Sequence, residues 1–314
     1  MIINTFNVIY KQIIMNFTLH QLNIFLSVSE HRSMTRAAKA LHMTQPAVSI
    51  QMRQLQEAVG IPLVNIAGKK LYLTEAGEEF HRFCLRLSEG KEHFEATVSQ
   101  LKGGLKGKLT VSAASTAKYY LPYLLGEFQK RFPEIEISLK VTNRNEVLSH
   151  LQENQYSIAI LTQVPDDDTI ESIPFLENPL VMAAHPTHPL AGKKISSLKK
   201  LEDEQFIFRE KGSGTRMVME SLFQKAGIDP KITMELGTNE AVKQAIMAGI
   251  GISMISELSL VTEKTLNKID SLTIRNYPVT TYWHVVYKKE KLLSPVTQNF
   301  ISFLSEPGIK KYLP

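Results

Sequence analysis

A short glycine-rich segment divides this chain into two parts and limits the folds that are open to it. The segment Lys102-Gly103-Gly104-Leu105-Lys106-Gly107 has three glycines in six residues and no apolar periodicity, which is typical of a flexible connection. A chain of 314 residues is long enough for two or three domains. We therefore expect a small N-terminal unit, a hinge over 103–107 and a larger C-terminal unit.

The two parts also differ in charge. Residues 1–107 hold 12 Lys and Arg against 8 Asp and Glu, whereas residues 108–314 hold 24 against 23. Most of the formal net charge of +5 therefore lies in the first third of the chain. A small basic unit on a nearly neutral body is typical of a polyanion-binding head joined to a body with another task.

The sequence also bears on the compartment of the protein. The single cysteine, Cys84, excludes an intrachain disulfide and a cysteine metal cluster, and a reducing cytoplasm fits this best. Polar residues interrupt the first apolar stretch and no cleavage site follows it, so we interpret residues 1–16 as an N-terminal extension. Since no stretch approaches eighteen uninterrupted apolar residues, we expect a cytoplasmic protein without a membrane partner.

The basic head begins with three predicted helices. Apolar residues recur at helical spacing over 19–31. Ser33 supplies a capping hydroxyl for the alanine-rich run 34–41, which has high helix propensity. Thr44 is a suitable N-cap for a third helix that runs to about residue 59. A small helix, a tight turn and a second helix in this order are typical of a helix-turn-helix.

The third helix has an apolar face and a polar face. The apolar face predicts burial of Val48, Met52, Leu55 and Val59, and the opposite face carries Gln45, Ser49, Arg53 and Gln56. Gln can bond bidentately to adenine, Arg to guanine, and Ser to a base or a phosphate. A solvated face is the usual meaning of such a polar stripe, but the order of the helices favours contact with bases in the major groove.

A hairpin and a long helix complete the head. Two short apolar runs over 61–74 surround a Gly-Lys-Lys tip, which predicts a β-hairpin wing with Lys69 and Lys70 placed for phosphate contacts. Thr74 then opens a helix to about Leu101 with one apolar side, formed by Phe80, Phe83, Leu87, Phe94, Val98 and Leu101. Such a helix predicts packing against a partner chain, and Cys84 within it is expected to be a packing residue.

Beyond the hinge, strands and helices alternate. The pattern predicts two series of strands with helices between them, the first over 108–113, 135–141 and 156–161, and the second over 180–184, 206–209, 232–236 and 252–255. This alternation predicts a parallel sheet with helices on both faces, and two series favour two lobes.

Loops of both series carry small hydroxyl residues where strands end and helices begin. The hydroxyl residues are Ser115, Thr116, Thr162, Thr215 and Thr238, and Gly214 and Arg216 stand beside Thr215 in the same loop. Helix N-termini with hydroxyls and an arginine nearby form an anion site, whereas plain N-capping is the alternative for each loop alone. Ligands of doubly wound sheets bind at the carboxyl ends of the strands, so four such loops favour a small anion in one cleft.

The residues from Phe17 to Gly77, above all SMTRAAKALHMTQPAVSIQMRQL followed by LYLTEAG, resemble the LysR-type transcriptional regulators. The resemblance extends over the chain from about Met15. It implies an α/β protein with a winged helix-turn-helix over 17–74, a dimerisation helix over 75–102 and a two-lobed periplasmic-binding-type effector domain over 108–314. It also implies a homodimer or homotetramer, often an activator, that binds an inverted repeat in double-stranded DNA, responds to a small anionic effector and contacts RNA polymerase.

The resemblance also implies roles for individual residues. DNA contacts carry over to Thr35, Thr44, Gln45, Pro46, Ser49 and Arg53, and effector contacts to Ser115, Thr116, Thr162, Gly214, Thr215 and Thr238. The chain is expected to cross between the lobes near Glu177 and Lys288, which gives lobe I over 108–177 and 289–314, and lobe II over 178–288. The run 208–216 is similar to that of Calvin-cycle (carbon dioxide fixation) operon regulators, a subgroup that responds to phosphorylated metabolites or nicotinamide nucleotides.

Two positions depart from the family pattern. Ile50 stands where many members carry arginine, and it can touch a thymine methyl but cannot hydrogen-bond a base. The wing has Leu63-Val64-Asn65-Ile66 where Leu-Phe-x-Arg is usual, so the lysines of the hairpin tip would supply the phosphate contact of the missing arginine.

Motifs for catalysis and metal binding are incomplete in this sequence. The run 212–215 lacks the lysine of a phosphate loop, proline separates His185 from His188, and residues 166–168 lack the pattern of a calcium loop. We therefore expect no enzyme activity, no cofactor and no metal site. The competing interpretation is a solute-binding protein dimerised by its N-terminal unit, which the missing signal sequence and the polar face of the third helix disfavour.

Overall fold

The computed structural model describes residues 16–68 and 70–313, in two units that divide between Lys91 and Glu92. The division falls inside helix α5 (Glu75–Leu101) rather than at the hinge predicted over 103–107. The reason is that Ala96 and Leu105 pack against the core of the second unit. The predicted extension, apart from residue 16, and Lys69 lie outside the described residues.

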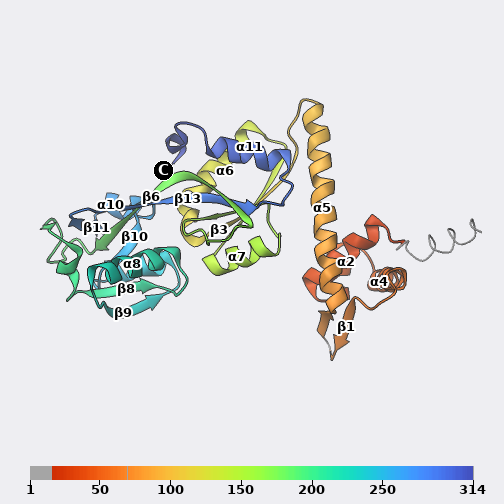
Figure 1. The fold of residues 1–314 in the computed structure, drawn as a ribbon, viewed down its shortest axis with the longest axis horizontal. Coiled ribbons are helices and arrows are strands. Elements are labelled where there is room, and N and C mark those ends of the chain that lie inside the picture. Colours follow the sequence, from red (N-terminus) through yellow and green to blue (C-terminus); the bar gives the residue numbers. More distant parts are fainter. Residues whose placement is uncertain (1–15, 69, 314) are drawn as a thin grey trace, which may run out of the picture. The chain divides into compact units, whose positions relative to one another are not determined.

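The first unit is a winged helix-turn-helix. Its elements are α2 (Leu19–His31), α3 (Met34–Ala40), α4 (Gln45–Val59), and the antiparallel strands β1 (Val64–Ala67) and β2 (Lys70–Leu73) (Figure 1). The side chains of Ser33 and Thr44 cap α3 and α4, as predicted. The apolar face of α4 is buried in the core of this unit, together with the Cys84 side chain, and burial raises the pKa of the Cys84 thiol to about 12.

The start of α5 is fixed against the wing. Thr74 Oγ1 donates a hydrogen bond to the Pro62 carbonyl at 2.7 Å and accepts one from the Gly77 N–H at 3.0 Å. A Cβ atom at Gly77 would lie 2.0 Å from the Leu63 carbonyl oxygen, so only glycine fits at this position. The Thr-Glu-Ala-Gly sequence thus ties the wing to the long helix.

The second unit is built on a mixed sheet. Its strand order is β10-β6-β13-β5-β3-β4, with β11 beside β6. The strands are β3 (Gly107–Ala114), β4 (Ile135–Thr142), β5 (Ile158–Leu161), β6 (Ile170–Ala184), β10 (Ser253–Ser256), β11 (Asp270–Ser271) and β13 (Val279–Lys288). Strand β3 is parallel to β4 and β5, but β13 is antiparallel to β5 and β6, so the prediction of a wholly parallel sheet was wrong.

Strands β6 and β13 pass through both lobes. The second half of β6 pairs with β10, whereas residues 284–286 of β13 pair with β5 of the first lobe. The register of β13 against β6 shifts between Trp283 and His284. The first crossing therefore falls within β6, near the expected Glu177, but the return falls within β13 rather than at Lys288.

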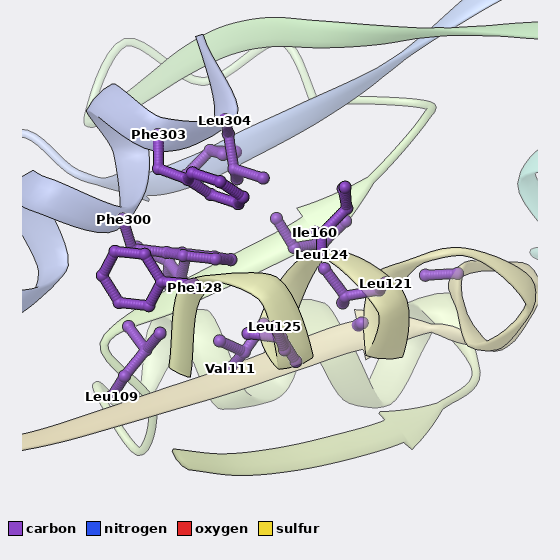
Figure 2. Packing of buried hydrophobic residues seen from close by; sticks show 14 of the residues in the cluster. Leu109, Val111, Leu121, Leu124, Leu125, Phe128, Ile160, Phe300, Phe303 and Leu304 are labelled. Atoms are coloured by element: carbon purple, nitrogen blue, oxygen red, sulfur yellow. The ribbon is translucent and has the colours of Figure 1, made fainter. Parts of the chain in front are cut away.

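Helices cover both faces of the first lobe. In Figure 1, α6 (Leu121–Arg131) and α11 (Pro295–Leu304) lie on one face and α7 (Arg144–Gln152) on the other. Figure 2 shows the core beneath α6 and α11, where the rings of Phe128 and Phe300 meet with centroids 5.0 Å apart. This core holds the carboxyl ends of β3 and β5 in place at the edge that faces the second lobe.

The second lobe has its own small sheet and helices. Strands β8 (Gln205–Arg209) and β9 (Lys231–Leu236) are parallel, and α8 (Gly214–Ala226) and α9 (Asn239–Met247) accompany them. The shorter elements of this unit are η1 (Ser115–Tyr119), β7 (Lys194–Ile195), η2 (Leu198–Leu201), η3 (Glu257–Ser259), α10 (Val261–Thr265), β12 (Thr273–Ile274) and η4 (Ile309–Tyr312). None of the helices within the described ranges combines the length and apolar character that a membrane crossing needs.

Candidate functional site

Helix α4 presents a polar outer face. Gln45 and Arg53 are exposed and Ser49 is half-buried, and Gln45 Nε2 donates a hydrogen bond to Ser49 Oγ at 2.8 Å. Arg53 lies 3.9 Å from Glu57, and both side chains are about two-thirds exposed, so this ion pair is weak and the guanidinium is available to a ligand. This face therefore offers several hydrogen-bonding groups to an acidic partner.

The other residues predicted to contact DNA are also exposed. They are Thr35 on α3, Thr44 and Pro46 at the start of α4, and Lys70 on β2. Gln56 differs from the other residues of the predicted polar stripe, because its Oε1 accepts hydrogen bonds from the Leu63 and Val64 N–H groups at 2.8 and 3.2 Å. Gln56 thus has a structural task, which is to join α4 to the wing.

In the second unit, a small cavity lies where residues of both lobes meet. Its volume is about 20 Å³, and its lining is formed by Ala114, Ser115, Thr116, Arg144, Thr162, Asn178, Arg209, Ser213, Gly214, Thr215 and Trp283. Five of the seven residues predicted for the effector site are therefore brought together. The space is enough for one or two water molecules, so a larger ligand requires side chains or lobes to move.

The N-terminus of α8 is close to the first lobe at this cavity. A Cβ atom at Gly214 would lie 2.8 Å from Thr162 Oγ1, so a larger residue at this position would force the Thr162 side chain or the lobe that carries it to shift. Ser213 stands at the N-cap position of α8, but its side chain makes no capping hydrogen bond. The start of α8 thus leaves backbone N–H groups at the cavity, where they favour negative charge.

Arg144 brings a positive charge to the cavity without a matching acid. Its Nε donates a hydrogen bond to the Gln163 carbonyl at 2.9 Å, and among the described residues its terminal nitrogens have no hydrogen-bond or ion-pair partner. Burial lowers the pKa of the Arg144 guanidinium. A partly desolvated cation of this kind is stabilised when an anion binds beside it.

Arg209, by contrast, is already engaged. Its guanidinium forms an ion pair with Glu210, hydrogen-bonds Asn239, and donates from Nη2 to Ser115 Oγ at 3.2 Å across the lobes. Asn239 Nδ2 also donates across the lobes, to Thr116 Oγ1 at 3.1 Å. These hydrogen bonds join the two lobes at the cavity.

Two of the predicted effector residues lie outside the cavity lining. Arg216 is 6% exposed, and its guanidinium binds Glu220 at 2.7 Å, Glu235 at 2.6 Å and the Arg209 carbonyl, so its role in this arrangement is structural. Thr238 caps α9 by accepting a hydrogen bond from the Ala241 N–H at 3.1 Å. Thr238 therefore acts as an N-cap, which was the alternative to an anion contact for each loop.

Sequence reasoning missed several lining residues. Arg144 lies two residues after the carboxyl end of β4, as the first residue of α7, where the rule that located Thr162 would also have found it. Asn178 and Trp283 lie in the middle of β6 and β13, whose passage between the lobes the strand pattern did not predict. Trp283, the only tryptophan of the chain, is 1% exposed, so its fluorescence can report on the cavity.

Comparisons with known families match both units. The model described as "LysR substrate binding domain" matches residues 102–307, and that described as "Bacterial regulatory helix-turn-helix protein, lysR family" matches residues 19–78. The HTH-type transcriptional activator CmpR of Synechocystis sp. is 39% identical over 92% of this chain and 95% of the relative. The RuBisCO operon transcriptional regulator of Acidithiobacillus ferrooxidans is 42% identical over 91% and 93%.

Solved structures agree with these matches. The regulatory domain of Synechocystis CcmR in complex with 2-PG is 42% identical, with a TM-score of 0.61, and the match covers 63% of this chain and 95% of that domain. Full-length CbnR complexed with its target DNA is 25% identical, with a TM-score of 0.65, over 92% of this chain and 99% of CbnR. The resemblance seen in the sequence is confirmed, including its Calvin-cycle subgroup, and the relatives are transcription regulators rather than enzymes.

Proposed function

Because the chain belongs to the LysR family of bacterial transcription regulators, we propose that a small phosphorylated anion, bound in the cavity between its lobes, controls its action on carbon-fixation genes. The observation that carries this proposal is Arg144, a partly buried cation at the cavity with no acidic partner among the described residues. The free N–H groups at the start of α8 and the hydroxyls of Ser115, Thr116 and Thr215 add donors for the oxygen atoms of such an anion.

The first ligand to test is 2-PG. The CcmR regulatory domain, which is 42% identical over most of its length, was solved with 2-PG bound. Phosphoenolpyruvate, ribulose bisphosphate and NADPH are the other ligands to compare, since they also carry phosphate groups. Inorganic phosphate serves as the control for binding of a phosphate group alone.

The cavity also suggests how binding changes the protein. A ligand larger than one or two waters must displace lining side chains, and three of these, Ser115, Thr116 and Arg209, take part in the hydrogen bonds across the lobes. The ligand then favours a lobe arrangement that fits it better, and it shifts the population toward that arrangement by its difference in affinity. In the oligomer, such a shift changes the placement of the DNA-binding units and the bending of the operator.

Helix α5 supports a homodimer as the basic unit, from which a homotetramer can form. Leu87, Phe94 and Leu101 follow one another at intervals of seven residues and are 39%, 67% and 84% exposed. Apolar residues at this spacing pack against a second helix in a coiled coil. Two copies joined in this way present two α4 helices to an inverted repeat.

For DNA binding, we assign base contacts to the outer face of α4 and phosphate contacts to the wing. The base contacts belong to Gln45, Ser49 and Arg53, and the supporting contacts to Thr35, Thr44, Pro46, Lys69 and Lys70. We further infer that the protein binds double-stranded DNA in the cytoplasm and that, if it is an activator like its relative CmpR, it contacts RNA polymerase. In Lys70→Ala, we expect weaker binding to all sequences and a salt slope that is smaller by about 1; loss at a single base would contradict the phosphate role.

Ligand binding is tested with the full chain and Trp283 fluorescence. Titration with 2-PG should change the emission in a saturable way, and inorganic phosphate should act only at much higher concentration. An unchanged signal alone does not decide the matter, so isothermal titration calorimetry is run in parallel. Absence of heat and of a fluorescence change with every ligand named above would refute the effector site.

A further inference from the structure

The outermost residue in the first half of α4 is apolar. Val48, Met52 and Leu55 form the buried stripe of α4, each with 0% exposure. With a turn of about 100° per residue, Ile50 projects about 170° away from the centre of this stripe, farther from it than Gln45, Ser49 or Arg53. Its side chain is 44% exposed, which agrees with this direction.

The neighbours of Ile50 on the helix are suited to DNA. Pro46 and Arg53 lie one turn before and one turn after it on the same side of the helix, and both are exposed. If α4 enters the major groove with the side that lies opposite its buried stripe, Ile50 is the side chain in the first half of the helix that reaches deepest toward the base edges. Of the proposed base-contacting residues, Arg53 lies nearest to it in direction. A single exposed apolar residue is common on protein surfaces, so the argument depends on this position rather than on exposure alone.

The chemistry of the major groove offers one group that matches Ile50. All four bases present hydrogen-bonding atoms there, but thymine alone also presents a methyl group, at C5. Isoleucine covers the methyl favourably, but against the other bases it would remove water from polar atoms and give them no partner. We propose that Ile50 contacts a thymine methyl and makes the protein select thymine at one position of each half-site; this inference rests on the proposed role of α4.

The test removes the methyl group without changing the base pairing. Duplexes that the full chain binds best are selected from a random pool, and each thymine of the best duplex is replaced in turn by deoxyuridine. For the wild type, we expect one position per half-site at which the replacement weakens binding about four-fold, the value for one buried methyl-sized group. For Ile50→Ala, binding to the thymine and uracil duplexes should be equal at that position.

Control variants keep the result interpretable. Ile232, which is 48% exposed on β9 of the other unit, gives the matched variant Ile232→Ala, which should keep the wild-type sensitivity to uracil. Thermal unfolding and binding to non-specific DNA establish that Ile50→Ala is folded. If no thymine is sensitive, or if Ile50→Ala keeps the same sensitivity, the proposal is overturned.

A further comparison separates this proposal from the one on which it rests. Selection is repeated with Gln45→Ala and Arg53→Ala. Altered preference in these variants, together with an unaltered thymine preference in Ile50→Ala, would reject the role of Ile50 and keep α4 as the base-contacting helix. Unaltered preference in all three variants would reject the role of α4 itself.

Discussion

Replacing Arg144 by glutamine should weaken effector binding strongly while leaving the fold intact. Glutamine keeps a polar side chain, two bonds shorter than that of arginine, but removes the charge and the forked donor geometry. Charge-assisted hydrogen bonds contribute about 1.5–3 kcal/mol, and at about 0.59 kcal/mol for RT this predicts a loss of about 10- to 150-fold in affinity for 2-PG. Without ligand, the variant should keep the wild-type stability, because Arg144 has no acidic partner in the part of the chain that the structure describes and burial already disfavours its charge.

The assay is isothermal titration calorimetry of the full chain with 2-PG, combined with thermal unfolding in the absence of ligand. Arg275→Gln is the matched control, since Arg275 is exposed, lies outside the cavity lining and loses the same charge on substitution. The control should bind like the wild type. If Arg144→Gln and Arg275→Gln both bind 2-PG within two-fold of the wild type, the assignment of Arg144 to the anion is refuted.

Three other predictions concern stability, each measured by thermal or urea unfolding of the full chain. Gly77→Ala should lower the free energy of unfolding by about 3 kcal/mol, because its methyl group clashes with a backbone carbonyl. Gly90 lies in the same helix with open space around it, so Gly90→Ala should raise the free energy of unfolding by about 0.5–1 kcal/mol. Equal effects of the two substitutions would contradict the close approach at Gly77. Thr116→Val should cost about 1–3 kcal/mol, because a buried amide donor from the second lobe loses its acceptor; a neutral result would mean that the lobes are not held there. The hydrogen bond from Arg216 lowers the pKa of the Glu235 carboxyl below its ordinary value of 4.5, so this pair stabilises the folded state above pH 4.5 and loses that effect as the pH falls through the lower pKa of the folded state. Glu235→Gln should therefore destabilise the protein at neutral pH but not in acid. A difference in stability that does not depend on pH would contradict this linkage.

Local signals in the sequence were enough to predict most of the DNA-binding unit. Ser33 and Thr44 as caps are short-range features, and the structure has them where the sequence indicated. Gln56 is the exception, since its partners lie seven and eight residues away in the wing. Helical periodicity placed it on the polar face but contains no information about that contact.

The lining of the proposed effector site was predictable only in part, because it depends on contacts between distant segments. Loops at the ends of regular strands could be found, and Ser115, Thr162 and Thr215 line the cavity as predicted. Trp283 lies in β13, which crosses between the lobes. This crossing depends on the strands with which β13 pairs, and the residue pattern of β13 itself does not indicate them. The role of Arg216 depends on Glu235, nineteen residues away, which the sequence does not link to it.

The most direct test of the whole account is footprinting of the full chain on the DNA upstream of its own gene, with and without 2-PG. The account predicts a salt-sensitive footprint over an inverted repeat that shortens or shifts when 2-PG is added. In Arg144→Gln, the same footprint should form but should no longer respond at the 2-PG concentration that shifts the wild type. No protection at moderate salt by the folded, dimeric protein, or a response to 2-PG that persists unchanged in Arg144→Gln, would contradict it.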